Sequence, residues 1–427
     1  MRVLFVSSSP LKREVGVGNT FLNIFDSFED VEFASICTRN GNPEPPISKC
    51  FCITEKDILK NLLLKEPAGK MVDVKQSNWQ SLLCRDGKVI TFVKQTRWTI
   101  FFWMQNMVWK LGSWKSKELE NFILDFRPDI IFTSLTNAVY LNNLILHVHE
   151  VSQAKLAVYV WDDYYSMKRF MLSPLRWIKH LIDRVYMRQV VQRADIFYVI
   201  SHMQKMEYEK SLKIPCKILT KGADFIELPK PKVQYNDPIQ IIFTGNIGLN
   251  RWKSLHMIAD VLERINQDGI KAQLRIYTAT PLTHKMKKAL NREESSFLMG
   301  SIPSCAVPEI QRNADMLVHV EALDLGSRLR VRHSFSTKIV DYLKAARPIL
   351  AVGPRNVASI DHLERNNCAI IADNKVELEQ KLRSFLDSPE KMDKIIQNAY
   401  ACGLKYHNKH DIQKMLQRDL EEICRKK

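Results

Sequence analysis

Short apolar runs separated by segments of helix length are the feature that most limits what this chain can fold into. In the first half these runs are RVLFVS (2–7), DIIFT (129–133), LAVYVW (156–161) and DIFYVIS (195–201). In the second half the same pattern predicts strands at 239–244, 273–277, 316–320, 348–352 and 369–372, and then three helices from 376 to about 424. Apolar strands that alternate with helices are typical of parallel sheets, so the sequence predicts an α/β fold.

The alternation is interrupted once, and this break divides the chain. Residues 226–238 (IELPKPKVQYNDP) contain three prolines and no periodicity, which predicts a linker. We therefore expect an N-terminal Rossmann-like domain over 1–225 and a C-terminal one over 239–427, with the option that the last helix packs back on the first domain. With 45% hydrophobic residues, the chain has enough apolar material for two cores, which excludes a disordered protein.

Charge and cysteine content narrow the classes of partner. A net charge of +16 predicts an acidic partner, which nucleic acid, anionic lipid or a phosphorylated small molecule would each satisfy. The nine cysteines include no CxxC pair, so zinc-ribbon and thioredoxin-like spacings are absent and a reducing cytosol is expected. No run reaches the about 18 apolar residues that a bilayer-spanning helix needs. The sequence thus predicts a protein that is soluble or lies on a membrane surface.

Two glycine-containing segments follow predicted strands. Gly16 and Gly18, with Asn19 beside them, come after the first strand and before a periodic stretch at 21–28, the pattern of a strand, a glycine loop and a helix. In the second half a strand ends in Gly245-Asn246-Ile247-Gly248, and Arg251-Trp252-Lys253 opens a helix. Glycines let the backbone approach a ligand, and a helix start near a cation attracts phosphate. An ordinary strand-to-helix turn explains the second motif equally well.

The segment from 330 to 353 is the most informative. Ser336 is expected to cap a helix, and Thr337 and Lys338 lie at its N-terminus, where an anion would meet backbone donors and a positive charge. Asp341 follows one turn later, in position to accept hydrogen bonds from a sugar hydroxyl. The alternative is a capped helix with solvated charges.

The order of these motifs resembles that of the retaining glycosyltransferases of the large sucrose-synthase-like family. In particular the chain resembles the bacterial members that build capsule, O-antigen and other surface polysaccharides. The resemblance covers nearly the whole chain and also rests on VWDD (160–163), KGAD (221–224), FLMG (297–300), VPEI (307–310) and ADMLV (314–318). It implies the GT-B fold, in which two Rossmann-like domains face each other across a cleft.

The resemblance also implies a site without metal or cofactor, where cations and a helix dipole stabilise the leaving diphosphate. It assigns the diphosphate to Arg251 and Lys338, with Lys253 as a weaker candidate, and the nucleotide ribose to Asp341. Asp162 would orient the acceptor, although a turn residue is nearly as good an interpretation. The remaining residues form a donor loop and a reaction-centre loop: Gly245, Asn246, Gly248, Ser336 and Thr337 for the donor, and Gly16, Gly18 and Asn19 for the reacting sugar.

Three positions depart from the family pattern. Asn246 stands where members commonly have arginine, so Arg251 inherits the diphosphate role. The two glutamates that the family places eight positions apart fall on His333 and Asp341, so the first is lost and the second is replaced conservatively. Trp161 stands where many members have histidine, so no catalytic histidine carries over. These departures leave the donor sugar open.

Two stretches of the first domain combine cations with aromatic residues. Residues 88–117 hold six Lys or Arg, no acid and four tryptophans, and residues 167–193 hold seven Lys or Arg against one acid. Such a mixture suits a lipid headgroup interface. The alternative is that both stretches are helices packed on the sheet with cationic side chains outside, and some of the tryptophans must then be core.

The sequence thus predicts a glycosyltransferase that uses a nucleotide-diphosphate sugar, with a UDP-sugar favoured, on a lipid-linked or polysaccharide acceptor. It would work in the cytoplasm, peripherally on the inner face of the cytoplasmic membrane. Three alternatives remain: a non-hydrolysing sugar-nucleotide epimerase, a non-catalytic sugar-nucleotide-binding relative and a basic nucleic-acid-binding protein. Against nucleic acid, the sequence has no recognition helix, RRM-like or zinc motif.

Overall fold

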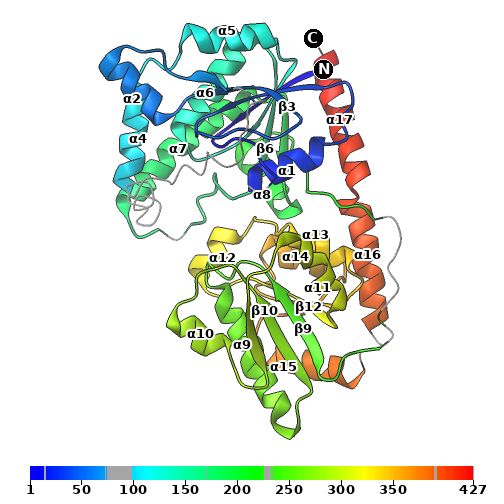
Figure 1. The fold of residues 1–427 in the computed structure, drawn as a ribbon. Helices are drawn as coiled ribbons and strands as arrows, with labels where there is room; N and C mark the ends of the chain where they lie inside the picture. Colours follow the sequence, from blue (N-terminus) through cyan, green and yellow to red (C-terminus); the bar gives the residue numbers. More distant parts are fainter. Residues whose placement is uncertain are drawn as a thin grey trace.

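A computed structural model describes residues 1–13, 16–72, 74, 99–169, 171–225, 232, 234–388 and 392–426 of the chain. Within these residues two α/β units, each built on its own sheet, lie one above the other (Figure 1). The α/β prediction is therefore confirmed. Of the predicted linker, residues 226–231 and 233 lie outside the described part.

The N-terminal sheet has eight strands within the described residues, in the order β4-β3-β2-β1-β5-β6-β7-β8. All neighbouring strands are parallel except β3 and β4, which are antiparallel. In the central register Val3 lies between Phe33 and Ile130. The strands are β1 (Arg2–Ser7), β2 (Glu32–Cys37), β3 (Ile47–Cys52), β4 (Lys70–Val72), β5 (Ile130–Ser134), β6 (Lys155–Val160), β7 (Ile196–Val199) and β8 (Lys217–Ile218).

Both faces of this sheet are buried, which explains its continuous apolar strands. On one face Phe5 packs against Phe21 and Phe25 of the first helix, and on the other face Leu4 and Val6 belong to a separate cluster. The helices are α1 (Gly16–Phe25), α2 (Glu55–Leu64), α4 (Thr99–Leu111), α5 (Lys117–Phe126), α6 (Val139–Ser152), α7 (Pro174–Arg193) and α8 (His202–Leu212).

One local prediction in this domain was wrong. The sequence placed a glycine loop before a helix at 21–28, but α1 begins at Gly16 and ends at Phe25. Gly16 and Gly18 therefore lie in the first turns of the helix. The reason is close packing, because a Cβ on Gly18 would lie 2.3 Å from the backbone nitrogen of Lys12. The glycine lets α1 start directly against the loop that follows β1.

The C-terminal sheet has six parallel strands in the described residues, in the order β11-β10-β9-β12-β13-β14. These are β9 (Ile239–Thr244), β10 (Ala272–Tyr277), β11 (Ser296–Gly300), β12 (Met316–Val320), β13 (Ile349–Val352) and β14 (Ile370–Ala372), so the five predicted strands are confirmed. From β9 the chain adds strands first on one side of the sheet and then, from β12 on, on the other side, so the strand order reverses between β9 and β12. In such sheets ligands bind beyond the carboxyl ends of the strands at this switch point.

Helices surround this second sheet. They are α9 (Arg251–Ile265), α10 (His284–Leu290), α11 (Val307–Asn313), α12 (Leu325–Val331), α13 (Lys338–Lys344), α14 (Ala358–Arg365) and α15 (Lys375–Asp387), with short 3-10 turns η1 (Asn266–Asp268) and η2 (Ser304–Ala306). Helix α9 begins at Arg251, as the sequence predicts. Its apolar face, including Leu255 and Leu262, packs on the sheet.

The last two helices, α16 (Asp393–His407) and α17 (Lys409–Arg425), run along one side of both units (Figure 1). Helix α17 lies against the N-terminal unit. There Lys409 Nζ lies 2.6 Å from Asp26, and Tyr198 and Lys217 both donate hydrogen bonds to the buried Asp419, at 3.2 and 2.6 Å. These contacts join the end of the chain to the first unit.

Candidate functional site

A group of charged residues meets at the switch point of the C-terminal sheet. Gly245 directly follows β9 and has φ near +145°, and its N–H donates to Tyr277 O at 2.8 Å. A Cβ at this position would lie 1.5 Å from Lys338 Nζ. Only glycine therefore leaves room for the Lys338 ammonium to lie against the backbone of the loop. The two predicted donor motifs, far apart in sequence, are brought together here.

Arg251, the first residue of α9, is held by a buried carboxylate. Its Nε and Nη2 donate to Glu321 Oε2 and Oε1, at 2.9 and 3.1 Å. Glu321 follows directly after β12 and its side chain is 2% exposed. The bidentate pair fixes the plane of the guanidinium, and Nη1 makes no hydrogen bond to another described residue. That edge is free for a ligand oxygen. We call Gly245, Arg251, Glu321 and Lys338 the donor cluster.

The donor cluster has an excess of positive charge. Burial, and then the charge of Arg251, lower the pKa of Lys338 to about 8. Burial also lowers the pKa of the neighbouring His319 to about 3, with help from Arg251 and Lys338, so this imidazole is neutral. The pKa of Glu321 is raised by burial, against the opposing effect of Arg251. A lysine whose charged form is disfavoured by burial and by a neighbouring guanidinium is a group that an anionic ligand would stabilise.

The other predicted donor residues lie outside this cluster, and the side chains of Asn246, Lys253 and Asp341 are exposed. Asn246 is exposed and accepts a hydrogen bond from the N–H of Gly248 at 2.6 Å. Lys253 is exposed on α9. Asp341 is exposed on one side, and desolvation by the surrounding protein raises the pKa of its carboxyl group, against the opposing charge of Lys221.

The N-cap prediction for this helix was off by one residue. Helix α13 begins at Lys338 with Thr337 as its N-cap, and Ser336 instead accepts a hydrogen bond on its carbonyl from the N–H of Ile339, at 3.1 Å. Thr337 makes no side-chain capping hydrogen bond. The reason is that the chain turns tightly at Ser336 before the first α-helical residue.

Asp162 lies at a contact between the two units. Ser334, from the C-terminal unit, donates to Asp162 Oδ1 at 2.5 Å, and Tyr164 donates to Oδ2 at 3.2 Å. Asp162 also lines a cavity of about 520 Å³ whose walls come from both units. The carboxylate thus already accepts two hydroxyl groups. This arrangement suits an orienting role better than that of a free base.

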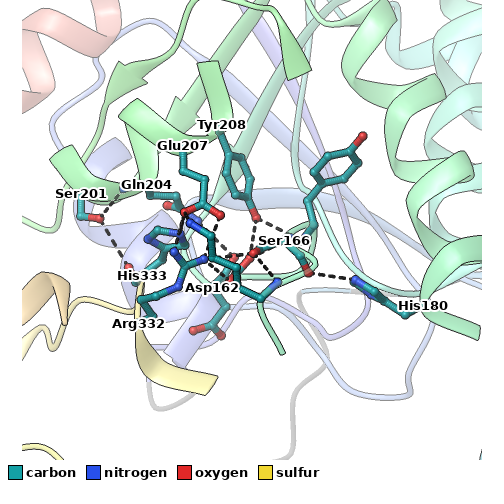
Figure 2. A network of polar contacts seen from close by, with 12 residues as sticks. Asp162, Ser166, His180, Ser201, Gln204, Glu207, Tyr208, Arg332 and His333 are labelled. Atoms are coloured by element: carbon teal, nitrogen blue, oxygen red, sulfur yellow. Dashed lines mark hydrogen bonds and ion pairs between the residues drawn. The ribbon is translucent and has the colours of Figure 1, made fainter. Parts of the chain in front are cut away.

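Next to Asp162, Arg332 reaches from the C-terminal unit into the N-terminal one (Figure 2). Its Nη2 donates to Glu207 Oε1, Asp163 Oδ2 and Ser166 Oγ, at 2.9, 3.2 and 3.0 Å. Burial opposes ionisation of Glu207, but the hydrogen bonds and charge of Arg332 outweigh it and lower the pKa of Glu207 to about 2. This network fixes the segment after α12 against α8.

His333, at the position of the family's first glutamate, belongs to the same contact. It is 1% exposed, and its Nε2 lies 3.4 Å from Glu207 Oε2 (Figure 2). Burial lowers its pKa, so the imidazole is neutral. The side chain is therefore part of the junction between the units.

The N-terminal loop residues lie at the carboxyl end of β1. Gly16 and Gly18 lie in α1, and Asn19 Nδ2 donates to the carbonyl of Arg13 at 2.8 Å. Within the described residues, no hydrogen bond or ion pair connects these three residues to the donor cluster.

Sequence reasoning did not single out Glu321, Arg332 or Glu207. For Glu321 a signal exists, since a carboxylate directly after a buried strand at a switch point is unlikely to be a simple turn residue. Arg332 and Glu207 give no such signal. Across the part of the chain that the structure covers, no group of three His, Cys, Asp or Glu side chains is arranged to hold a metal ion.

No protein-family description and no curated protein matches this sequence. Solved structures do match over almost the whole chain. HepE from Anabaena in complex with UDP matches with a TM-score of 0.63 and 12% identity, over 99% of this chain and 100% of that one. Sucrose-phosphate synthase from Thermosynechococcus elongatus matches with a TM-score of 0.60 and 10% identity, over 99% and 98%. The trehalose-6-phosphate protein from E. coli bound to UDP-2-fluoro glucose matches at 0.59 and 12%, over 98% and 99%.

These similarities show the fold. The chain has the GT-B fold, with two Rossmann-like units, and the fold predicted from the order of motifs is confirmed.

Proposed function

From the GT-B fold and the donor cluster, we propose that this chain is a glycosyltransferase. It transfers a sugar, with retention, from a UDP-sugar to a lipid-linked or polysaccharide acceptor in cell-surface polysaccharide synthesis. The observation that carries the proposal is the meeting of Arg251 and Lys338 at the switch point of the C-terminal sheet. The similar HepE structures hold UDP or UDP-glucose, which supports a uridine nucleotide as the donor.

The chemistry requires charge stabilisation more than proton transfer. As the bond to the donor sugar breaks, negative charge develops on the diphosphate, and Arg251 and Lys338 neutralise it. Glu321 holds Arg251 in place before the donor arrives, so little reorganisation is needed. Asp341 accepts hydrogen bonds from the ribose. The acceptor hydroxyl attacks from the face that the diphosphate leaves and gives its proton to the departing phosphate oxygen. Asp162 orients the hydroxyl together with Ser334 and Tyr164.

The proposal is tested by calorimetric titration of the purified protein with UDP, ADP and a DNA duplex. Saturable binding of UDP, weaker binding of ADP and none of DNA are expected. Arg251→Ala and Lys338→Ala should each weaken UDP binding about ten- to a hundredfold, as the loss of a charge-assisted contact does. Lys344→Ala, on the exposed face of the same helix as Lys338, is the matched control. Unchanged UDP affinity in both site variants would refute the donor-site assignment.

We also propose that the N-terminal unit binds the membrane surface. Large apolar side chains are exposed on three of its helices: Leu59, Leu62, Leu63 and Leu64 on α2, Phe102, Met104, Met107 and Leu111 on α4, and Leu175, Ile178, Leu181 and Val185 on α7. We call these the apolar surface. Helix α7 adds Arg176, Arg184 and Arg188. Exposed apolar residues with flanking cations favour a lipid interface.

The described tryptophans of the first basic stretch are buried or half-buried, with Trp103 in the second group. Trp109 and Trp114 are buried, as expected for part of this stretch, while residues 88–98, including Trp98, lie outside the described part. Among the described helices, none has both the length and the apolar character to cross a bilayer.

Co-sedimentation with vesicles of graded anionic lipid content tests the membrane proposal. Leu175→Asn, Ile178→Asn and Leu181→Asn combined should release the protein from vesicles and leave UDP binding unchanged. Val376→Asn, at a still more exposed apolar position on α15 of the other unit, should sediment as the wild type does. Replacing Lys179 is avoided, because its Nζ lies 2.5 Å from the buried Asp183. Sedimentation of the triple variant at the wild-type level would refute the proposal.

A further inference from the structure

The cavity of about 520 Å³ between the units has an unusual wall. Arg169, Arg176 and Lys179 enter it from the N-terminal unit, and Arg330 enters it from α12 of the C-terminal unit. Apolar side chains also line the cavity, among them Phe102, Met171, Leu249 and Leu329. None of the residues that line the cavity belongs to the donor cluster. We call this space the interdomain cavity.

The carboxylates in its wall are already neutralised or hydrogen-bonded. Asp163 lies 3.2 Å from Arg332 Nη2, and Asp183 lies 2.5 Å from Lys179 Nζ. Asp162 accepts its two hydroxyl donors as described above. These three acids therefore do not balance the arginines of the cavity.

The three arginines have no such partners. Among the described residues, Arg169, Arg176 and Arg330 form no ion pair and no side-chain hydrogen bond. Arg169 lines the cavity together with His180. Burial, and then the charge of Arg169, lower the pKa of His180 to about 4. His180 is thus neutral, with Nε2 at 2.9 Å from Ser166 O, and it contributes no charge of its own. Three unpaired guanidinium groups from two units converge on one cavity.

We propose that the interdomain cavity binds a phosphate or diphosphate group of the acceptor, and that the acceptor is a lipid-linked glycan. This inference deepens the proposed function and depends on it. Guanidinium groups match phosphate oxygens with paired hydrogen bonds, and three of them suit a group with two or more negative charges. The donor diphosphate has its own cations in Arg251 and Lys338, so a second anion site points to the other substrate.

The apolar part of the wall indicates that the anion carries a hydrocarbon chain. Phe102 belongs to α4, and Arg176 and Lys179 belong to α7, the same helices that carry most of the apolar surface. A lipid that leaves the cavity along these helices would stay on apolar side chains as far as the membrane. The sugar at the other end of the diphosphate would lie next to Asp162.

The test uses farnesyl diphosphate as the probe and the full-length protein saturated with UDP, so that the donor cluster is occupied. Calorimetry should show saturable binding of farnesyl diphosphate and much weaker binding of farnesol. Arg169→Gln and Arg330→Gln should each weaken that binding about ten- to a hundredfold. Arg188→Gln, an exposed arginine of α7 outside the cavity, should leave it unchanged.

The possible results separate this inference from the proposed function. Binding of UDP without binding of farnesyl diphosphate would overturn the cavity assignment and leave the donor site standing. If farnesol bound as tightly as farnesyl diphosphate, the affinity would come from the apolar surface, and the inference would be wrong. If Arg188→Gln lost as much affinity as Arg169→Gln, the affinity would come from general charge, and the inference would again be wrong. Preferential binding of a glucuronate oligosaccharide over farnesyl diphosphate would replace the phosphate with a carboxylate and also overturn the inference. If the protein did not bind UDP, the proposed function itself would fail, whatever the result with farnesyl diphosphate.

Discussion

The substitution Lys338→Met should make the protein more stable and a poorer ligand binder at once. The ammonium lies against the backbone of Gly245, 5.8 Å from the centre of the Phe243 ring, and is repelled by Arg251. Burial, and then the repulsion by Arg251, lower the pKa of Lys338 from 10.5 to about 8. Because a depressed lysine pKa means that the charged form is less stable in the folded state, methionine should raise the free energy of unfolding at pH 7 by about 1–3 kcal/mol.

The depressed pKa of Lys338 predicts that stability and UDP affinity change with pH in opposite directions. Between pH 8 and 10.5 the unfolded chain keeps a proton that the folded protein has lost, so wild-type stability should rise through this window relative to the variant. UDP binding requires the charged lysine, so wild-type affinity for UDP should fall as the pH increases above about 8. Lys338→Met should bind UDP about ten- to a hundredfold more weakly at pH 7 and lack this decline.

Thermal unfolding and calorimetry from pH 7 to about 10 measure both effects. Each kcal/mol should appear as a shift of about 1 °C in Tm, because the entropy of unfolding grows with chain length and this chain has 427 residues. Lys344→Met, an exposed lysine of the same helix, is the control and should change neither quantity. If Lys338→Met were no more stable than the wild type at pH 7, burial would not destabilise the charged lysine. If its UDP affinity declined with pH as that of the wild type does, Lys338 would not be the group whose charge UDP binding requires.

The remaining predictions concern the neighbours of this lysine. Glu321→Gln should keep the fold but release Arg251, weakening UDP binding several-fold in calorimetry; unchanged affinity would show that the pair does not position the guanidinium. Asp341→Ala should weaken binding of UDP more than that of inorganic pyrophosphate, whereas Asp341→Glu should be tolerated; equal losses for both ligands would remove the ribose assignment. Arg332→Met should reduce the free energy of unfolding by about 3–5 kcal/mol in a denaturant titration, because Asp163 stays buried without its partner. Since the pKa of Glu207 is depressed to about 2, its stabilisation is present above pH 4.5 and is lost as the pH falls toward 2, and the variant should lack this acid transition.

Local pattern determined most of the secondary structure. Nine strands of the two sheets are apolar runs whose boundaries the sequence predicts to within a residue or two, because burial on both faces requires continuous apolar side chains. The sequence did not predict β2, β3, β4, β8 and β11, and the short strands β4 and β8 carry mostly exposed side chains. The start of α9 at Arg251 and the three closing helices follow from the same periodic signal. The start of α1 does not, since Gly16 and Gly18 read as a loop until the packing against Lys12 is known. The GT-B arrangement does not follow from local pattern and was predicted from the order of motifs, whereas the strand order of each sheet comes from the structure alone.

The partners of the charged residues were decided by tertiary structure alone. Sequence reasoning places Arg251 and Lys338 at the same edge of a sheet, but it does not show that Glu321 holds one of them or that burial depresses the pKa of the other. Asp162 looks the same in sequence whether it is a turn residue or an acceptor for Ser334 from the other unit. Each of these contacts joins segments that are distant along the chain. The residues next to a side chain in the sequence do not determine such a partner, because only the packing of the sheet and of the two domains brings the partner within hydrogen-bonding distance.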